Sequence, residues 1–412
     1  MSQSKEDILI ISHFSGGENP ECRAEEFKKH NNRFNYIADR LGKNNSVHML
    51  TSAFFHTQKK HIPKLSEKLD HYTITYIKEP GYSKNVCIKR FYSHYIYGRN
   101  IKKYLYKLTS TPKVIYCSVP SLSGALAATK YAKKKHIPLI IDVQDLWPEA
   151  FKIVFNPPLL GRLIYFPLKE MADYIYKNAT KVIAVSETYC KRAESVRNER
   201  TGESIYLGTS FEAFDEIPPL SSIKEEKTYI LIYIGTLGHS YDLKCAIEAY
   251  GIAKEHLSDV FHLKFWVLGD GPLQEEFQEY SQKRSLDVEF KGRLDYSDMV
   301  GYLKMADIAL NPIVGKAAQS IINKHADYAA AGLPVVSTQD SEEYKKLLTD
   351  FQAGFTCING DVEDMAEKIC FLVKNDEIRQ VMAVNSRKMG ETLFNRDRTY
   401  DKIENIIINI KK

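Results

Sequence analysis

The chain has 412 residues, of which 44% are hydrophobic and 26% are charged, and its net charge is +5. This length predicts two domains, and the composition is ordinary for a soluble globular protein and does not indicate disorder. Residues 1–215 hold 33 Lys and Arg against 21 Asp and Glu, while residues 216–412 hold 24 against 31, so the first half suits an anionic partner.

The N-terminal stretch MSQSKEDILIIS lacks the basic flank and the length of a secretory signal. No apolar run approaches the ~20 residues that cross a bilayer, so we expect a cytoplasmic protein without a membrane span. The seven cysteines are scattered, which indicates reduced thiols and neither a disulfide framework nor a zinc site.

Short apolar runs alternate with longer amphipathic segments along the whole chain, a pattern typical of parallel sheets covered by helices. We expect strands over residues 8–12, 46–50, 73–77, 114–117, 139–143, 181–185, 229–234, 263–268, 287–290, 307–310, 334–337 and 354–357. The segment before residue 229 carries Pro-Pro, serines and a charge run. We therefore predict an α/β protein with domains over 1–210 and 229–395, a hinge over 211–228, and a C-terminal helix over 396–412 that packs on the first lobe.

Residues 82–107 interleave tyrosines with lysines and arginines. A solvated helix packed by its aromatic stripe is the commoner explanation. Contact with a membrane surface is the functional alternative, and we rank it above stacking on nucleic acid, because no nucleic-acid module accompanies the segment.

The stretch DVQDLWPE, residues 142–149, follows an expected strand. Asp145 could cap a short helix above Trp147, or it could be a cleft carboxylate that faces a sugar. Asp142 is the more structural of the two acids. The twelve histidines are dispersed without metal-ligand spacing, so we expect each to be a surface or satisfied core residue.

Glycine-rich turns follow several expected strands: SGG at 15–17, GTLG at 235–238 and GDGP at 269–272. Each is a weak signal that also fits a tight strand-to-helix connection. Neither a dinucleotide-binding G-x-G-x-x-G nor a P-loop is present.

Residues 319–337, QSIINKHADYAAAGLPVVS, read as a helix that starts near Asn323 and leads into a strand. The unpaired amides of residues 321–324, the helix dipole and Lys324 would together hold a diphosphate, and Asp327 could accept from a ribose diol. The alternative is a helix capped by Asn323, with Lys324 and Asp327 merely exposed.

Six stretches, taken together and in order, resemble the retaining family-four glycosyltransferases of the GT-B fold over nearly the whole chain. They are the Gly-Gly loop with Arg33 and YIADRL, then IPLIIDVQDLWPE, YIGTLG, FWVLGDGPLQEEF, VEFKGRLDYSDMVGYLKMADIALNP and NKHADYAAAGLPVVS. The second stretch is similar to the form in members that assemble bacterial capsule or O-antigen polysaccharides.

The resemblance implies two Rossmann-like parallel-sheet lobes that face a cleft, with the nucleotide sugar held chiefly by the C-terminal lobe. The family's two glutamates, which contact the donor sugar and the ribose, map onto Gln319 and Asp327, and this puts the identity of the sugar in doubt. Thr236 stands where many members have an arginine, so Lys324 becomes the expected cation on the diphosphate. The implied donor-binding residues are Gly16, Gly17, Gly235, Thr236, Gly238, Gly269, Arg293, Ser320, Ile322, Asn323 and Asp327.

The implied catalytic residues are Lys324, which stabilises the departing diphosphate, Gln319, and Asp145, which orients the acceptor or balances charge on the sugar. We expect no metal and no cofactor. The expected donor is a nucleotide sugar with uridine as its nucleoside, and the expected acceptor is a polyprenyl-diphosphate-linked glycan. Residues 82–107 are expected to contact the inner face of the membrane. Nucleic acid is not expected. The alternatives are a nonhydrolysing nucleotide-sugar epimerase and a non-catalytic protein that binds sugar nucleotides or nucleic acid.

Overall fold

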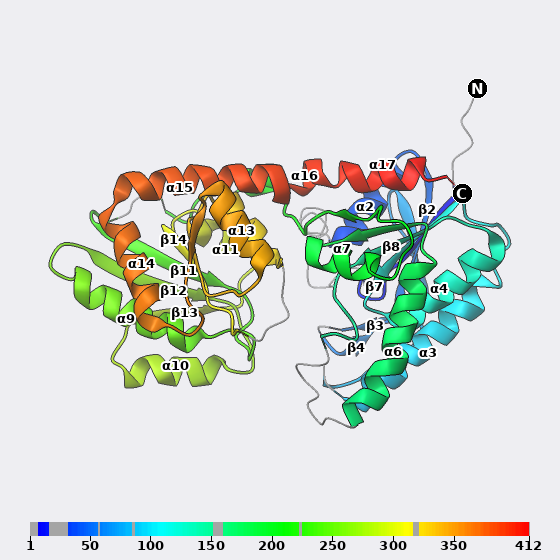
Figure 1. The fold of residues 1–412 in the computed structure, drawn as a ribbon, viewed down its shortest axis with the longest axis horizontal. Helices are drawn as coiled ribbons and strands as arrows, with labels where there is room; N and C mark the ends of the chain where they lie inside the picture. The colour runs from blue at the N-terminus through cyan, green and yellow to red at the C-terminus, as the bar shows by residue number, and fades with distance from the viewer. Residues whose placement is uncertain are drawn as a thin grey trace. The chain divides into compact units, whose positions relative to one another are not determined.

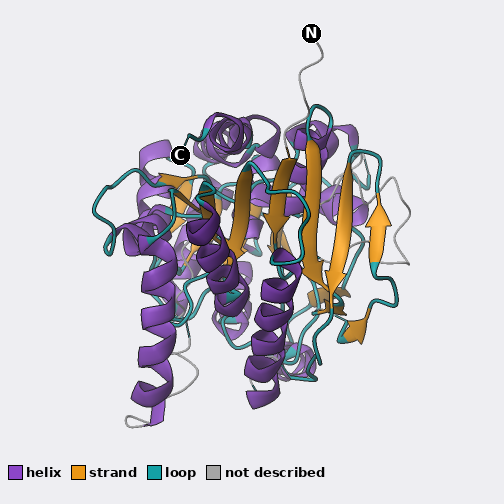
Figure 2. Ribbon diagram, turned by 90° about the vertical axis from the view of Figure 1, so that its right-hand side faces the viewer, coloured by secondary structure: helices purple, strands orange, loops and turns teal. Residues whose placement is uncertain are grey.

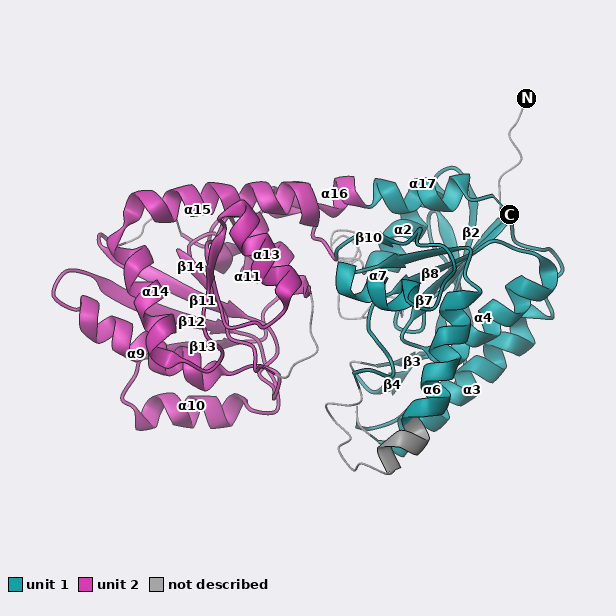
Figure 3. Cartoon of the chain, in the orientation of Figure 1, with its two compact units in different colours: residues 1–206, 400–412 teal, residues 207–399 magenta. Residues whose placement is uncertain are grey.

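A computed structural model of the chain describes residues 7–15, 32–56, 58–84, 87–150, 160–221, 225–315 and 321–411. The chain forms two compact units (Figures 1 and 3): unit 1 is Met1–Tyr206 with Tyr400–Lys412, and unit 2 is Leu207–Thr399. Where the sequence predicts a hinge over 211–228, helix α8 (Phe211–Glu216) belongs to unit 2, because Phe211 and Phe214 are buried there.

Unit 1 is built on a sheet whose strands run parallel, except for one short antiparallel edge strand. Its order is β10 (Glu203–Ser204), β9 (Lys181–Ala184), β8 (Leu139–Val143), β7 (Val114–Val119), β1 (Asp7–Ile11), β2 (Ser46–Ser52), β6 (Tyr72–Ile77) and β5 (Ser66–Lys68). A separate hairpin pairs β3 (Phe54–Phe55) with β4 (Lys60–His61). The central strands are buried, which suits their β-branched sequences.

Helices cover the sheet of unit 1 (Figure 2). They are α2 (Arg33–Gly42), α3 (Ile88–Leu105), α4 (Leu122–Lys135), α6 (Leu160–Lys177), α7 (Glu187–Glu194) and α17 (Asp401–Asn409). Arg40 on α2 pairs with Asp401 and Glu404, which fixes the C-terminal helix on this unit. Arg33 is buried and pairs with Asp142 at 2.8 Å, so Asp142 is structural, as predicted.

Unit 2 has a parallel sheet in the order β13 (Val288–Gly292), β12 (His262–Leu268), β11 (Thr228–Ile234), β14 (Ile308–Asn311), β15 (Val335–Ser337) and β16 (Gly354–Thr356). Its other helical segments are α9 (Leu243–Leu257), α10 (Gln274–Lys283), α11 (Tyr296–Leu303), α12 (Asn323–Ala330), α13 (Glu342–Phe351), α14 (Val362–Lys374), α15 (Asp376–Met389), η1 (Gly390–Phe394) and α16 (Arg396–Thr399). Its core lies between the sheet and helices such as α9 and α14.

Every strand that the sequence predicts is present. The two sheets have the same topology: successive strands are added on one side of the first strand, and later strands are then added on its other side. This reversal falls between β1 and β7 in unit 1 and between β11 and β14 in unit 2. Ligands of such sheets bind outside the carboxyl ends of the strands at this point. Each unit is thus an α/β fold around a parallel sheet, as the sequence predicts.

Candidate active site

Two glycine turns meet at the carboxyl ends of β11 and β12 in unit 2. Gly235 and Gly269 have φ angles of +135° and +132°, and a Cβ atom on Gly269 would lie 1.9 Å from the carbonyl oxygen of Gly235. Leu237 donates its amide to Asp270 O at 2.8 Å. Only glycine permits this close approach. The turns are therefore built as a pair, and the amides of Gly235 and Leu237 are already bonded within the protein.

Helix α12 is anchored at the reversal point by Tyr328. The Tyr328 hydroxyl accepts from the amide of Ile234 at 3.0 Å and donates to the carbonyl of Leu310 at 3.1 Å, so it bridges the ends of β11 and β14. Lys324 precedes Tyr328 by four residues, which places both side chains on the same face of the helix. Tyr328 therefore directs Lys324 toward the turn at Gly235.

Lys324 is a buried amine, contrary to the alternative that it is merely exposed. Its side chain packs between Tyr233 and Tyr241, with Nζ 4.1 Å and 4.0 Å from the ring centroids. The residue is 6% exposed, and Nζ has no hydrogen-bond partner in the described structure. Burial lowers the pKa of Lys324 well below its ordinary value. An anion at this point would supply the missing partner.

The start of α12 differs from the expected capping. The helix begins at Asn323 with Ile322 as the N-cap residue, so Asn323 is not the cap. The amide of Ile322 donates to Nδ1 of His325 at 3.4 Å, which removes this amide from the predicted set of unpaired donors. The His325 ring stacks on Tyr344 at 3.6 Å, and burial lowers its pKa well below the ordinary value. His325 is therefore a neutral cap that the sequence alone does not reveal.

Asp327 already has a partner within unit 2. The Tyr296 hydroxyl donates to Asp327 Oδ1 at 3.1 Å and lies 2.5 Å from Oγ1 of Thr209. Burial raises the pKa of Asp327 to about 6, although Tyr296 and Thr209 lower it. A ribose would have to share this carboxylate with Tyr296.

Other predicted donor-site residues lie around the same edge. Gly238 is buried, while Thr236, Arg293 and Asn323 are exposed. The carbonyl of Thr236 accepts from the Tyr233 hydroxyl at 2.8 Å, which ties the turn to a ring that packs on Lys324. Four predicted residues lie outside the described residues: Gly16, Gly17, Gln319 and Ser320.

Asp145 belongs to unit 1, where it follows β8. Its carboxylate accepts from the Trp147 indole N–H at 3.1 Å, and this bond holds Trp147 beside it. Burial raises the pKa of Asp145, although Trp147 and Arg90 oppose the shift. The carboxylate is half-buried and therefore remains available for the predicted role.

Comparisons with known proteins support this geometry. A model of the family described as "Glycosyl transferases group 1" matches residues 228–375, which span the glycine turns, α12 and the sheet of unit 2. Residues 228–375 therefore form a glycosyltransferase domain. The whole chain shares the GT-B fold of solved glycosyltransferases. A search of curated proteins finds no significant match.

Solved structures share the fold of this glycosyltransferase at low sequence identity. Sucrose-phosphate synthase from Thermosynechococcus elongatus is 14% identical with a TM-score of 0.68, and the match covers 98% of both chains. HepE of Anabaena in complex with UDP is 13% identical with a TM-score of 0.66, covering 99% of this chain and 100% of that one. WaaG, a glycosyltransferase involved in lipopolysaccharide biosynthesis, is 14% identical with a TM-score of 0.65, covering 98% and 100%.

Proposed function

We propose that the enzyme transfers a sugar from a UDP-sugar, with retention of configuration, to a polyprenyl-diphosphate-linked glycan in surface-polysaccharide synthesis. Retention and the acceptor are proposed on the motif resemblance, and the solved structures of HepE with UDP and with UDP-glucose support the donor class. The observation that carries the proposal is Lys324, a buried amine without a hydrogen-bond partner in the described structure, at the reversal point of the unit 2 sheet.

The chemistry follows from the position of Lys324. When the bond between the sugar and the diphosphate breaks, negative charge grows on the departing phosphate oxygens, and a nearby fixed cation stabilises that charge. The first-turn amides of α12 at Asn323 and Lys324 lack partners within the helix and add donors. Neither a metal nor a cofactor enters this proposal, and no group of His, Cys, Asp or Glu in the described ranges could hold a metal ion.

A binding experiment tests the donor site. We expect Lys324→Met to weaken binding of UDP by about 10-fold or more, because a charge-assisted hydrogen bond is lost, while binding of uridine stays unchanged. Lys244→Met is the matched control, since the Lys244 side chain is 40% exposed and pairs with Glu276 at 2.5 Å. Isothermal titration calorimetry at fixed ionic strength measures the UDP and uridine affinities of the wild type and both variants. Equal UDP affinity in wild type and Lys324→Met would remove Lys324 from the site.

Helix α3 carries the surface that we propose for the membrane. Its outward side exposes Ile88, which is 86% exposed, together with Tyr92 and Tyr95, while basic residues lie along the same helix. The exposed basic residues are Lys89, Arg99, Lys102 and Lys103. Aromatic and basic side chains together suit an anionic lipid surface. Among the described helices, none is long and apolar enough to cross a bilayer.

Vesicle binding tests this surface. We expect the enzyme to sediment with vesicles rich in phosphatidylglycerol and not with pure phosphatidylcholine vesicles, and the bound fraction should fall with added salt. The double variant Lys102→Glu, Lys103→Glu should lose most of the binding. The control Lys374→Glu, Lys402→Glu changes the same charge at exposed positions on α14 and α17. Equal loss in both variants would show that net charge, and not α3, causes binding.

A further inference from the structure

Helix α15 lies at the surface of unit 2 and exposes apolar side chains (Figure 1). Val381 is 59% exposed, Val384 is 69% exposed and Ile378 is 39% exposed. The other side of the helix is buried in unit 2 through residues such as Ser386 and Met389. Apolar side chains that are exposed on successive turns of one helix form a surface that a partner could cover.

A groove of about 640 Å³ runs beside the N-terminal half of α15. Its walls come from the end of α13, from β16 and from α15 itself, and β16 is the edge strand of the described sheet. The apolar residues that line it are Leu348, Phe355, Ile378, Val381 and Met382. The groove is continuous with the exposed valines, because Val381 belongs to both.

Charged residues flank the two valines along the same line of the helix. Glu377, Val381, Val384 and Lys388 follow one another at intervals of four, three and four residues. These are the intervals between contact positions in a two-stranded coiled coil, and they keep all four side chains on one face. Glu377 and Lys388 are exposed, and neither forms an ion pair within the described part of unit 2. We call these four residues the α15 stripe.

The charges of the α15 stripe decide which partner fits it. A second α15 in parallel orientation would bring Glu377 against Glu377 and Lys388 against Lys388, and both contacts are repulsive. In antiparallel orientation Val381 faces Val384 of the second copy, and Glu377 faces Lys388 of the second copy. A two-fold axis repeats each contact, so two pairs of opposite charge enclose two apolar contacts. The stripe is therefore complementary to itself in the antiparallel orientation.

We propose that two copies of the chain associate through the α15 stripe, with their α15 helices antiparallel about a two-fold axis. The C-terminal half of one α15 then lies against the N-terminal half of the other, where the groove opens. Val384 and the aliphatic stem of Lys388 cover the groove of the other copy. The contact uses residues of unit 2 alone and does not rest on the proposed glycosyl transfer.

The size of this contact predicts a reversible dimer. An α-helix of 14 residues is about 21 Å long, so one helix and one groove from each copy form a contact at the small end of specific interfaces. Interfaces of this size belong to weak and transient complexes. We therefore expect monomer and dimer to exchange, with a dissociation constant in roughly the micromolar range.

Sedimentation velocity of the full chain between about 1 and 200 µM measures this association. The weight-average sedimentation coefficient of the wild type should rise with concentration from that of a monomer toward that of a dimer. Glu377→Lys brings lysines together and Lys388→Glu brings glutamates together, so each variant should weaken association by about 10-fold or more. Both positions are exposed, so both variants should fold like the wild type, which far-UV circular dichroism checks.

A mixture of the two variants separates the proposed contact from any other. In the mixture one protein carries lysine at both positions and the other carries glutamate at both. The two proteins should therefore associate with each other about as tightly as two wild-type copies, although neither associates alone. The double variant Glu377→Lys, Lys388→Glu exchanges the charges within one chain and should associate like the wild type.

Glu279→Lys on α10 is the matched control. Its side chain is 66% exposed and pairs with Lys283 at 3.4 Å, and the substitution changes the net charge as Glu377→Lys does. It should leave association unchanged, and an equal loss in this control would overturn the proposal. A wild type that stays monomeric at all concentrations would leave the stripe to a different partner and overturn the proposal too. Association that survives in both single variants, or that does not return in their mixture, would also overturn it.

Discussion

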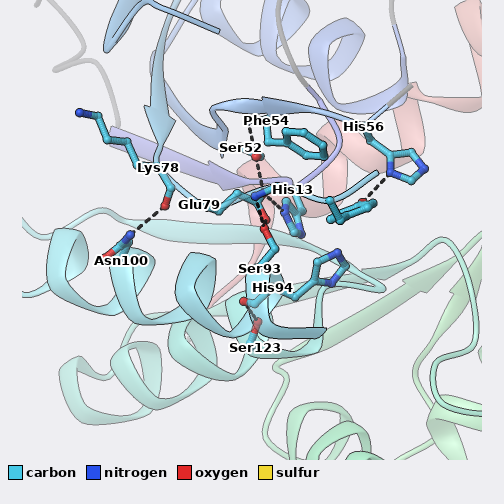
Figure 4. Close-up of polar contacts among 12 residues, drawn as sticks. His13, Ser52, Phe54, His56, Lys78, Glu79, Ser93, His94, Asn100 and Ser123 are labelled. Atoms are coloured by element: carbon cyan, nitrogen blue, oxygen red, sulfur yellow. Dashed lines mark hydrogen bonds and ion pairs between the residues drawn. The ribbon is translucent and has the colours of Figure 1, made fainter. Parts of the chain in front are cut away.

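The two units place opposite kinds of group at equivalent positions. Each sheet reverses its strand order beside its first strand, and each carries, among the described residues, a buried nitrogen without a hydrogen-bond partner close to that point: His13 Nδ1 in unit 1 and Lys324 Nζ in unit 2. His13 has the Glu79 carboxylate 2.5 Å from its other nitrogen (Figure 4). Lys324 has two tyrosine rings and a glycine turn, and no carboxylate of the described ranges is hydrogen-bonded to it.

The two buried nitrogens therefore differ in the charged groups that surround them. His13 has the Glu79 carboxylate on one ring nitrogen and aromatic rings around it. Lys324 offers a buried amine without a counter-charge, and a bound anion would favour its protonated form.

The largest effect should come from the paired glycine turns at the edge of the unit 2 sheet. We expect Gly269→Ala to lower the free energy of unfolding of unit 2 by about 3 kcal/mol or more, because its Cβ would overlap the Gly235 carbonyl and φ is +132°. Urea unfolding with amide hydrogen exchange measures this loss. Exchange should quicken in β11 and β12 and not in β1 and β7.

Gly360→Ala is the control for the backbone conformation. Its φ angle is +76°, and no described atom lies within 4 Å of the point where an alanine Cβ would stand, so only the conformational cost of about 1 kcal/mol applies. If the two alanine variants lose equal stability, the close approach of the turns is not what constrains Gly269.

The next effect contrasts the two buried nitrogens directly. Without ligand at pH 7, Lys324→Met should raise the free energy of unfolding by about 1–3 kcal/mol, because a buried amine without a hydrogen-bond partner is replaced by an apolar side chain of similar length. His13→Gln should lower it by about 1–2 kcal/mol, because Glu79 loses its proper donor. Urea titrations of both variants measure the sign of each change in the free energy of unfolding. Two changes of the same sign would contradict the contrast.

The lowered pKa of Lys324 also implies that stability depends on pH. Its folded-state pKa is lowered, so between that pKa and the unfolded value of 10.5 the unfolded chain binds a proton that the folded chain does not. Stability of the wild type should therefore rise with pH across this window, and Lys324→Met should lack that contribution. Urea titrations between pH 7 and pH 10 measure the two slopes. Parallel slopes would show that Lys324 does not titrate in the folded protein.

The fold is accessible from sequence because strand positions depend on local patterns. Runs such as ILIIS and YILIYI are apolar on both faces, which is typical of buried parallel strands. Short edge strands such as β10 and β5 escape prediction, because two or three residues carry no periodicity. Helix α8 falls inside the predicted hinge, since the burial of Phe211 and Phe214 depends on contacts far along the chain.

The site is only partly predictable. Lys324 stands out by its place in a helix, but its burial between Tyr233 and Tyr241 depends on residues more than 80 positions away. The contacts of Glu79 with His13, Ser52 and Ser93 escape prediction because these residues come from separate elements, and each histidine taken alone resembles a surface or core residue. The available signal is weaker and collective: polar residues at the carboxyl ends of three strands that turn out to be neighbours.

The smallest effect concerns Asp327, a buried carboxylate of unit 2. Its folded pKa is about 6 against an ordinary 3.8, so between these values the folded chain holds a proton that the unfolded chain has lost. Stability should fall as pH rises through this window, by on the order of 1 kcal/mol, and Asp327→Asn should remove the fall. Urea midpoints at pH 4.5 and pH 7 measure it, with the exposed Asp298→Asn as control. A fall that persists in Asp327→Asn would show that another group titrates in this window.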